Sequence, residues 1–293
     1  MNTNTRFSSM HTHTNFCDGK DDVETMCRAA YEKKLYSIGF SAHSPVEKQT
    51  GVISDWNLKE NRVNEYISEV RAAKERWQGK LKVFLGYEMD YISGRRTALD
   101  SDIKALNMDY LIGSVHYIFP KNGAEPFTID GSREEFEKGL NEGFNGNALE
   151  LMHSYYDAQA EMIALGGFEI LGHADLIKKN SHDKNLWHPE EELCRQREIA
   201  KAAKDSNIVI EINTGGINRK KINDVYPSLS FLYIIREYDI PVIITSDAHR
   251  AVDIDGAYDF ALNTLNIVKI KEHVIFNGKI DGKSVWLKEK ILK

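Results

Sequence analysis

Short apolar runs alternate with helical patterns along the whole chain. Runs of this length, bounded by polar and turn-forming residues, are typical of buried strands. We expect seven strands, at residues 5–10, 36–40, 81–87, 109–114, 167–172, 207–212 and 240–245.

Amphipathic segments separate these strands. In the first, residues 22–34, Val23, Met26, Cys27 and Ala30 recur at helical spacing, and Asp21 or Asp22 is a candidate N-cap. The others lie at residues 57–78, 95–106, 133–165, 190–205, 228–238 and 252–265. Strand–helix alternation of this kind predicts an α/β fold with a parallel sheet.

Seven or eight such units without an obvious break favour a closed or nearly closed barrel. A doubly wound open sheet is the alternative, but no GxGxxG or GxxxxGK[ST] motif follows the first strand. The turn-rich stretch 117–133 is long enough to be a lid or a binding loop.

Composition narrows the class of protein. The 293 residues are 42% hydrophobic, which allows one large domain or two small ones, and we expect a single domain over 1–293. No apolar run approaches about 18 residues, so we expect no membrane-spanning helix. Three cysteines suit a reducing compartment, and we expect a cytoplasmic protein. A net charge of −6 argues against a general nucleic-acid or membrane binder.

The chemistry-bearing residues gather just past the predicted strands. Six of the ten histidines lie there together with three carboxylates; the nine candidates are His11, His13, Asp18, His43, Glu88, His116, His173, Asp247 and His249. In a parallel barrel the carboxyl ends of all strands meet on one face, where barrel active sites are found. We therefore expect these side chains to converge there.

Imidazole and carboxylate ligands together suit Zn²⁺, Mn²⁺ or Fe²⁺. Because one catalytic zinc uses about three protein ligands, nine candidates imply two or three divalent ions. Both rings of a His-x-His pair on an extended segment point to the same side, and Glu88 has two oxygens that can bridge two ions. Multinuclear sites of this kind are typical of hydrolytic displacement at phosphorus.

Seven segments occur in an order that resembles the PHP (polymerase and histidinol phosphatase) metallo-phosphoesterase superfamily: HTHTNFCDG, FSAHSP, GYEMDY, SVHYI, GHADLIKK, EINTGG and TSDAH. They span residues 11–249, most of the chain. YSIGFSAHSP, GHADLIKK and the stretch 130–136 resemble the branch that hydrolyses histidinol phosphate.

The resemblance implies a distorted (β/α)7 barrel with a trinuclear metal site at the carboxyl ends of the strands. By motif position, one ion takes His11, His13, Glu88 and Asp247. A second shares Glu88 and adds His116 and His173, and the third takes Asp18, His43 and His249. Some relatives have histidine where this chain has Asp18, which bears on the metal preferred at the third site.

The implied reaction is hydrolysis of L-histidinol phosphate to L-histidinol and phosphate, in histidine biosynthesis, by attack of a metal-bound hydroxide. As hypotheses, Asp247 takes a proton from the water and His249 assists the leaving alkoxide. The implied partner is thus a small phosphorylated substrate.

Further residues are candidates for contact with the substrate. An arginine can form paired hydrogen bonds with phosphate, which makes Arg197 a candidate, and His153 lies on a predicted helix. Ser44 and Tyr117 directly follow two candidate ligands. His182, His188 and His273 have no partner pattern, so we expect them at the surface.

Three alternative functions remain open. A centre of this type could act on phosphotyrosine, a nucleotide or a DNA 3′ end. The chain could be a metal-binding but inactive module. It could also be a C–N hydrolase of the amidohydrolase type, although that family commonly places a lysine bridge on a middle strand where this chain offers Glu88.

Overall fold

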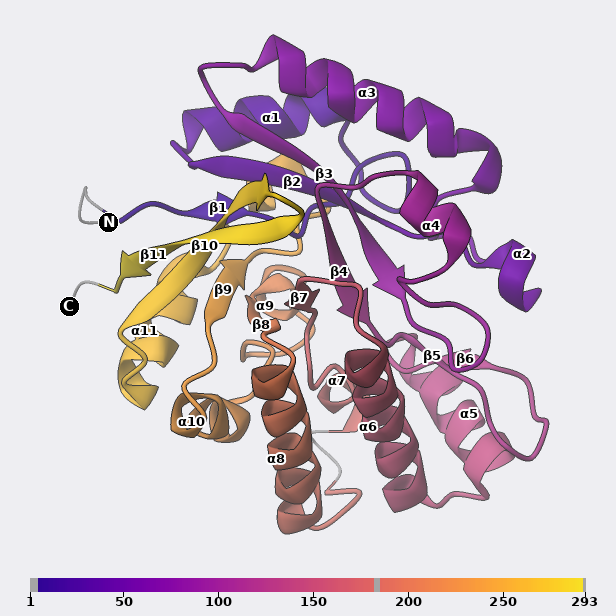
Figure 1. The fold of residues 1–293 in the computed structure, drawn as a ribbon. Coiled ribbons are helices and arrows are strands. Elements are labelled where there is room, and N and C mark those ends of the chain that lie inside the picture. Colours follow the sequence, from indigo (N-terminus) through magenta and orange to yellow (C-terminus); the bar gives the residue numbers. More distant parts are fainter. Residues whose placement is uncertain (1–4, 182–184, 292–293) are drawn as a thin grey trace.

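A computed structural model describes residues 5–181 and 185–291. Its main sheet contains seven parallel strands in chain order (Figure 1). These are β1 (Ser8–Ser9), β2 (Ser37–His43), β3 (Lys82–Asp90), β4 (Tyr110–Ser114), β7 (Ile170–Leu171), β8 (Val209–Asn213) and β9 (Val242–Thr245). All seven correspond to predicted strands, and β2 and β3 continue far enough to include His43 and Glu88.

The sheet nearly closes on itself beyond β1 and β9. Thr12 and Ala248 form a parallel bridge, in which Ala248 O accepts from His13 N at 2.8 Å and Ala248 N donates to His11 O at 3.1 Å. This contact joins the segments after the first and last strands, and each of its two residues lies between two candidate ligands. The predicted seven-stranded barrel is confirmed, and the open doubly wound sheet is wrong.

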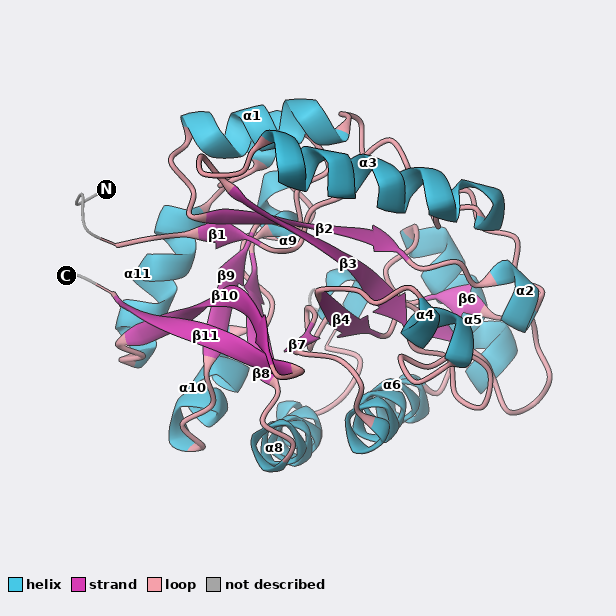
Figure 2. Ribbon diagram, turned by 45° about the horizontal axis from the view of Figure 1, so that its top comes forward, coloured by secondary structure: helices cyan, strands magenta, loops and turns pink. Residues whose placement is uncertain are grey.

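Helices cover the outside of the barrel (Figure 2). The longer ones are α1 (Val23–Glu32), α3 (Val63–Arg76), α5 (Arg133–Phe144), α6 (Ala148–Leu165), α8 (Pro189–Asp205), α10 (Leu229–Glu237) and α11 (Tyr258–Val268). Shorter ones are α2 (Glu47–Thr50), α4 (Ser101–Ala105), α7 (Lys178–Ser181), α9 (Gly215–Asn218) and the 3-10 helices η1 (Glu60–Arg62) and η2 (Ala251–Asp253). No helix in the described ranges is long and apolar enough to cross a membrane.

Helix α1 follows the predicted pattern. The Asp22 side chain accepts from Thr25 N at 2.7 Å, as an N-cap does, and the four predicted apolar positions are buried. The single helix predicted over 133–165 is wrong, because α5 ends at Asn145 in the left-handed conformation (φ 50°). Asn147 then caps α6 by accepting from Glu150 N at 3.2 Å.

The long segment after β4 forms part of the cavity described below. Within it, β5 (Tyr117–Ile118) and β6 (Phe127–Thr128) pair as an antiparallel hairpin. The Phe127 ring lies so close to α5 that a Cβ at Gly139 would come within 2.3 Å of it, so only glycine fits there. Asn122 Nδ2 also donates to Glu142 O at 2.9 Å. These contacts fasten the segment to α5.

A C-terminal hairpin, which the sequence pattern did not reveal, consists of β10 (Glu272–Ile280) and β11 (Lys283–Lys290). It packs against barrel residues near the amino ends of the strands. Phe276 meets Phe84 edge-on with 5.0 Å between ring centroids, and Val209 and Ile243 belong to the same cluster. The hairpin thus covers the end of the barrel opposite the candidate ligands.

His273, predicted at the surface, is instead buried in this hairpin. The residue is only 2% exposed, and its ring stacks on that of Phe7 with centroids 5.3 Å apart. Its Nε2 has no hydrogen-bond partner. Burial lowers the pKa of His273 to about 4, against a partial opposite effect of Glu289. The same prediction is confirmed for His188, which is exposed and caps α8. His182 lies outside the described residues.

We expect His273 to make the protein less stable in acid. The unfolded chain binds a proton on this imidazole below about pH 6.5 and the folded protein only below about pH 4, so its contribution is complete above pH 6.5 and is lost as the pH falls toward 4. The free energy of unfolding of the metal-free protein can be measured with urea at pH 7 and at pH 4.5. Between these two pH values, we expect this free energy to fall by roughly 2–3 kcal/mol less in His273→Phe than in the unsubstituted protein. An equal loss in both proteins would contradict this assignment.

Candidate metal centre

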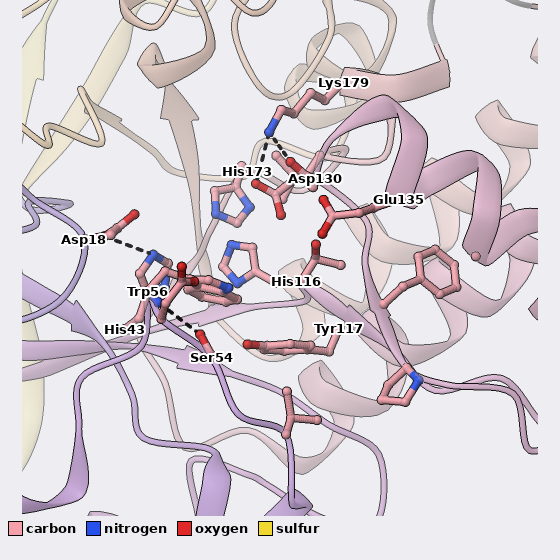
Figure 3. Close-up of a pocket in the computed structure, with 18 of the residues that line it drawn as sticks. Asp18, His43, Ser54, Trp56, His116, Tyr117, Asp130, Glu135, His173 and Lys179 are labelled. Atoms are coloured by element: carbon pink, nitrogen blue, oxygen red, sulfur yellow. Dashed lines mark hydrogen bonds and ion pairs between the residues drawn. The ribbon is translucent and has the colours of Figure 1, made fainter.

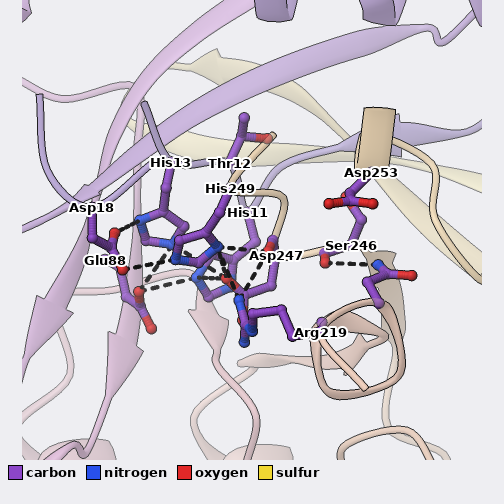
Figure 4. A network of polar contacts seen from close by, with 12 residues as sticks. His11, Thr12, His13, Asp18, Glu88, Arg219, Ser246, Asp247, His249 and Asp253 are labelled. Atoms are coloured by element: carbon purple, nitrogen blue, oxygen red, sulfur yellow. Dashed lines mark hydrogen bonds and ion pairs between the residues drawn. The ribbon is translucent and has the colours of Figure 1, made fainter. Parts of the chain in front are cut away.

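The nine candidate ligands meet at one end of the barrel. They come from the segment after β1, from the carboxyl ends of β2 and β3, and from the loops after β4, β7 and β9. Parallel strands of similar length place these positions side by side, and Figure 4 shows His11, His13, Asp18, Glu88, Asp247 and His249 facing one another. The convergence expected from the sequence is therefore present.

Glu88 lies at the centre of the cluster, and its two oxygens face different imidazoles. Oε2 is 3.0 Å from His11 Nε2, 3.0 Å from His43 Nδ1 and 3.4 Å from His13 Nε2. Oε1 is 2.8 Å from His173 Nε2 and 3.4 Å from His116 Nε2. Oxygens that face separate imidazoles suit a carboxylate that bridges two ions.

A second group lies beside the first, around Asp18. Its Oδ2 is 2.9 Å from His249 Nε2, and its Oδ1 is 3.6 Å from His13 Nδ1 and 3.8 Å from His43 Nε2. Asp247 Oδ1 joins the two groups, at 3.3 Å from His13 Nε2 and 3.7 Å from His11 Nε2. In the described part of the chain, four sets have potential ligand atoms mutually within 4.8 Å: His13, Asp18, His43 and His249; His11, His13 and Glu88; His43, Asp90 and His116; and Glu88, His116 and His173.

The donor set fits divalent metal ions. Five buried atoms that face the cluster have no partner in hydrogen-bonding geometry, although some lie 3.0–3.4 Å from one another: His11 Nε2, His13 Nε2, Asp18 Oδ1, His43 Nδ1 and Glu88 Oε2. Buried polar atoms are almost always paired, so a concentration of unpaired ones calls for an explanation. Imidazole nitrogens and carboxylate oxygens are the ligands that Zn²⁺, Mn²⁺ and Fe²⁺ prefer, and cations among them would satisfy these atoms.

Two carboxylates that are not among the nine candidates orient histidines of the cluster. Glu211 Oε1 lies 2.6 Å from His11 Nδ1, and Asp90 Oδ1 lies 2.6 Å from His116 Nδ1. Such contacts hold Nδ1 protonated, so that Nε2 is free to bind a metal, and they are usual behind ligating histidines. The sequence reasoning missed both residues. The available signal was a carboxylate inside the apolar run of β8, and an aspartate two positions after Glu88 in β3.

The charge of the cluster also favours cations. Burial opposes the charged imidazolium of His116, yet the carboxylates of Glu88 and Asp90 raise its pKa to about 10. Burial would likewise raise the pKa of Glu88, but His11, His43 and His116 hold it well below its usual range. At His116 the carboxylates therefore outweigh burial, whereas at His43 burial prevails and lowers the pKa to about 4.

A cavity of about 710 Å³ opens above the cluster. One wall is aromatic: Trp56 stacks on Tyr117 with ring centroids 5.2 Å apart (Figure 3). Another wall is charged and includes Asp130, Glu135 and Lys179, of which Lys179 Nζ lies 3.3 Å from Asp130 Oδ2. The cavity can thus hold a small molecule with one end at the cluster.

The four predicted substrate contacts lie in different places. Tyr117 lines the cavity, whereas Ser44 is fully buried and is not among the lining residues. His153 is in the middle of α6 and does not line the cavity either. The structure does not bring Arg197 there, because it is on α8 with its side chain 49% exposed and Nη1 2.8 Å from Glu237 Oε2.

A different arginine reaches the cavity. Arg219 follows α9 and lines the cavity beside the cluster. Its Nη2 donates to Asp247 Oδ2 at 2.8 Å, and its Nη1 lies 2.9 Å from His249 Nδ1 (Figure 4). Sequence reasoning missed it because it lies six residues beyond the end of β8, after a short helix.

A parallel barrel with histidines and carboxylates at the carboxyl ends of its strands is typical of metal-dependent hydrolases. The family model of the PHP domain matches residues 9–215, which is more than half of the chain. The chain therefore belongs to the PHP domain family and has the fold of its metal-dependent phosphoesterases, which confirms the resemblance.

Similar proteins agree with this placement. A Deinococcus radiodurans protein named "Probable histidinol-phosphatase" is 27% identical over 259 residues, 88% of this chain and 92% of that one. A candidate histidinol phosphatase from Listeria monocytogenes has a similar crystal structure, with a TM-score of 0.73, 24% identity, and coverage of 86% and 99%. So has histidinol phosphate phosphatase from Lactococcus lactis, solved with zinc, L-histidinol and phosphate, with a TM-score of 0.63, 18% identity, and coverage of 93% and 97%.

Proposed function

We propose that the protein is a phosphomonoesterase that hydrolyses L-histidinol phosphate to L-histidinol and phosphate. The observation that carries the proposal is the cluster of unpaired imidazole and carboxylate atoms at the base of a cavity of about 710 Å³. The histidinol-phosphatase names of the relatives and the ligands of the Lactococcus lactis structure support this substrate.

Two or three divalent ions would be held by the nine residues in the sets that the family resemblance implies. His11, His13, Glu88 and Asp247 would hold one ion, Glu88, His116 and His173 a second, and Asp18, His43 and His249 a third. The second set and the members of the third lie within the groups of atoms described above. Bound there, the ions would supply positive charge to the phosphoryl oxygens and make a nucleophile available from water near neutral pH.

Arg219 is placed to hold the phosphoryl group. Its guanidinium lines the cavity, and two of its nitrogens already contact Asp247 and His249. A planar guanidinium forms short, charge-assisted hydrogen bonds with phosphate oxygens. We therefore assign phosphate contact to Arg219 rather than to Arg197.

Asp247 and His249 are proposed to move protons. Asp247 Oδ1 faces His11 and His13, and there it would accept a proton from the attacking water. His249, whose side chain is 18% exposed, lines the cavity and would donate a proton to the leaving alkoxide. Both are also proposed ligands, so replacing either would change metal loading as well.

The upper cavity suits a cationic leaving group. Glu125, Asp130 and Glu135 line the cavity, as does Trp56, and carboxylates outnumber the lysines and arginine in its lining. Burial would raise the pKa of Asp130, but Lys179, followed by His116, lowers it, so this carboxylate stays ionised at neutral pH. Besides the hydroxyl that leaves the phosphate, histidinol carries an ammonium group and an imidazole ring, which match carboxylates and an aromatic face.

We propose that residues 1–293 form a single domain built around this site and that it works in the cytoplasm. Cys17, Cys27 and Cys194 are free, as expected in a reducing compartment. The matches to the relatives extend over most of the chain, in agreement with one unit.

A substrate panel tests the proposed function. Protein reconstituted with Zn²⁺ or Mn²⁺ should release phosphate from L-histidinol phosphate with a kcat/KM at least roughly 10³-fold above those for p-nitrophenyl phosphate and phosphotyrosine, because sites built for polar groups reject analogues that lack them. Chelator-stripped protein should be inactive and recover on adding metal. Equal rates on the other monoesters, or turnover of a nucleotide or phosphodiester alone, would contradict the substrate, and no turnover would favour a non-catalytic module.

A further inference from the structure

The side chain of Asn57 joins three strand ends beneath the cavity. Asn57 is 5% exposed. Its Nδ2 donates to Ser44 O and to Asp90 Oδ2, both at 2.8 Å, and its Oδ1 accepts from the Tyr117 hydroxyl at 2.8 Å. Each partner adjoins a proposed ligand, because Ser44 follows His43, Asp90 contacts His116, and Tyr117 follows His116.

Asp90 depends on this amide for its orientation. The carboxylate is completely buried, with Oδ1 on His116 Nδ1 and Oδ2 on Asn57 Nδ2. A buried carboxylate oxygen that loses its hydrogen-bond donor is destabilised, because it has no water to replace that donor. The carboxylate then turns or shifts toward another donor. Any such movement changes the direction in which His116 presents Nε2.

The same segment of chain supplies the aromatic wall. Trp56 precedes Asn57, and the Ser54 hydroxyl accepts from the backbone N–H groups of both. The Trp56 ring stacks on Tyr117 at an interplanar angle of 14° and meets His43 edge-on with centroids 4.5 Å apart. Figure 3 shows Trp56 and Tyr117 beside His43 and His116.

We propose that Asn57 is a positioning residue that couples the aromatic wall of the cavity, Trp56 and Tyr117, to the metal ligand His116 through Asp90. The coupling rests on the proposed metal centre. It runs along three consecutive hydrogen bonds, from the Tyr117 hydroxyl to Asn57, from Asn57 to Asp90, and between Asp90 and His116. A change at the Tyr117 hydroxyl is therefore transmitted through these bonds to His116, a proposed metal ligand.

Three substitutions separate the links. Asn57→Asp keeps the shape and the acceptor for Tyr117, but places a second carboxylate oxygen where Nδ2 now lies 2.8 Å from Asp90 Oδ2. Asn57→Leu removes all three hydrogen bonds. Tyr117→Phe removes only the link from the wall, at an atom remote from the cluster. Gln196→Leu is the matched control, because Gln196, on α8, is 2% exposed and its Nε2 donates to the hydroxyl of Tyr156, on α6, at 3.5 Å.

The readout is the set of Zn²⁺ dissociation constants of each whole protein, measured by competition with a chromophoric chelator, with the melting temperature of each metal-free protein beside it. Asn57→Asp and Asn57→Leu should weaken at least one constant about 10–100-fold, as loss of a partner behind a ligating histidine does. Tyr117→Phe should weaken the same constant by a smaller factor. Gln196→Leu should lower the melting temperature and leave the constants unchanged.

The outcomes separate this inference from the proposed function. If the unsubstituted protein binds no zinc, the metal centre itself is wrong. If it binds zinc and the Asn57 variants bind equally tightly, the coupling is overturned while the metal centre stands. Loss of affinity in Gln196→Leu, in proportion to its loss of stability, would also overturn it by showing a merely structural effect. If Asn57→Leu does not fold, Asn57→Asp and Tyr117→Phe decide the question.

Discussion

Replacing Glu88 by glutamine is expected to abolish most phosphatase activity and to lower the number of bound metal ions. The two carboxylate oxygens of Glu88 face five imidazoles between them. The glutamine amide offers one neutral acceptor in place of two charged ones. Charge stabilisation by metal is worth several kcal/mol, which corresponds to a loss of roughly 10³-fold or more in kcat. Phosphate release from L-histidinol phosphate and the metal content after dialysis are the measurements.

Glu169→Gln is the matched control for this change. Glu169 lies just before β7 at the opposite end of the barrel, where its oxygens contact Leu111 N at 2.8 Å and Lys279 Nζ at 2.8 Å. It should keep the metal content and kcat of the unsubstituted protein. A Glu88→Gln protein with its full complement of metal and normal kcat would show that Glu88 bridges no ions.

Substituting Arg219 by methionine should lower kcat/KM by roughly 10²–10³-fold, the usual cost of removing one donor aimed at developing charge. Arg219→Lys should recover part of the loss, because it keeps the charge but not the planar pair of donors. The inhibition constant of inorganic phosphate should weaken in parallel. Since Arg219 also contacts Asp247 and His249, metal content must be measured in the same samples.

Arg197→Met provides the comparison, because it removes an arginine that pairs with Glu237 on the outer surface of α8. It should leave both kcat/KM and phosphate inhibition within about twofold of the unsubstituted protein, since exposed ion pairs contribute little. The reverse order of effects would show that Arg197, as the sequence reasoning predicted, contacts the phosphate and that Arg219 does not.

The order of the strands and the convergence of the nine candidate ligands were predictable from local patterns. The apolar runs set the strands, and the residue directly after a parallel strand lies at the same edge of the barrel whichever strand it follows. His11, His116 and His173 were therefore placed correctly without knowledge of any distance. The break between α5 and α6 was missed because Asn145–Gly146–Asn147 was not interpreted as a stop and restart.

Other features could not be predicted in this way, since they depend on which atoms meet across the barrel. Glu211 is 200 residues from His11 in the chain and yet lies 2.6 Å from it. Asn57 precedes a helix and has no motif around it, so its three contacts emerge only when β2, β3 and β5 are adjacent. Nothing in the sequence distinguishes Arg219 from Arg197 as a residue that reaches the cavity.

The sequence by itself determined the α/β class, the seven strands, the end of the barrel that carries the imidazoles and the resemblance to the PHP family, because each follows from periodicity and from residue order along the chain. Only the tertiary structure decided which carboxylates orient the histidines, which arginine enters the cavity and that His273 is buried within a C-terminal hairpin. Those outcomes depend on contacts between residues far apart in sequence, and local periodicity carries no information about such contacts.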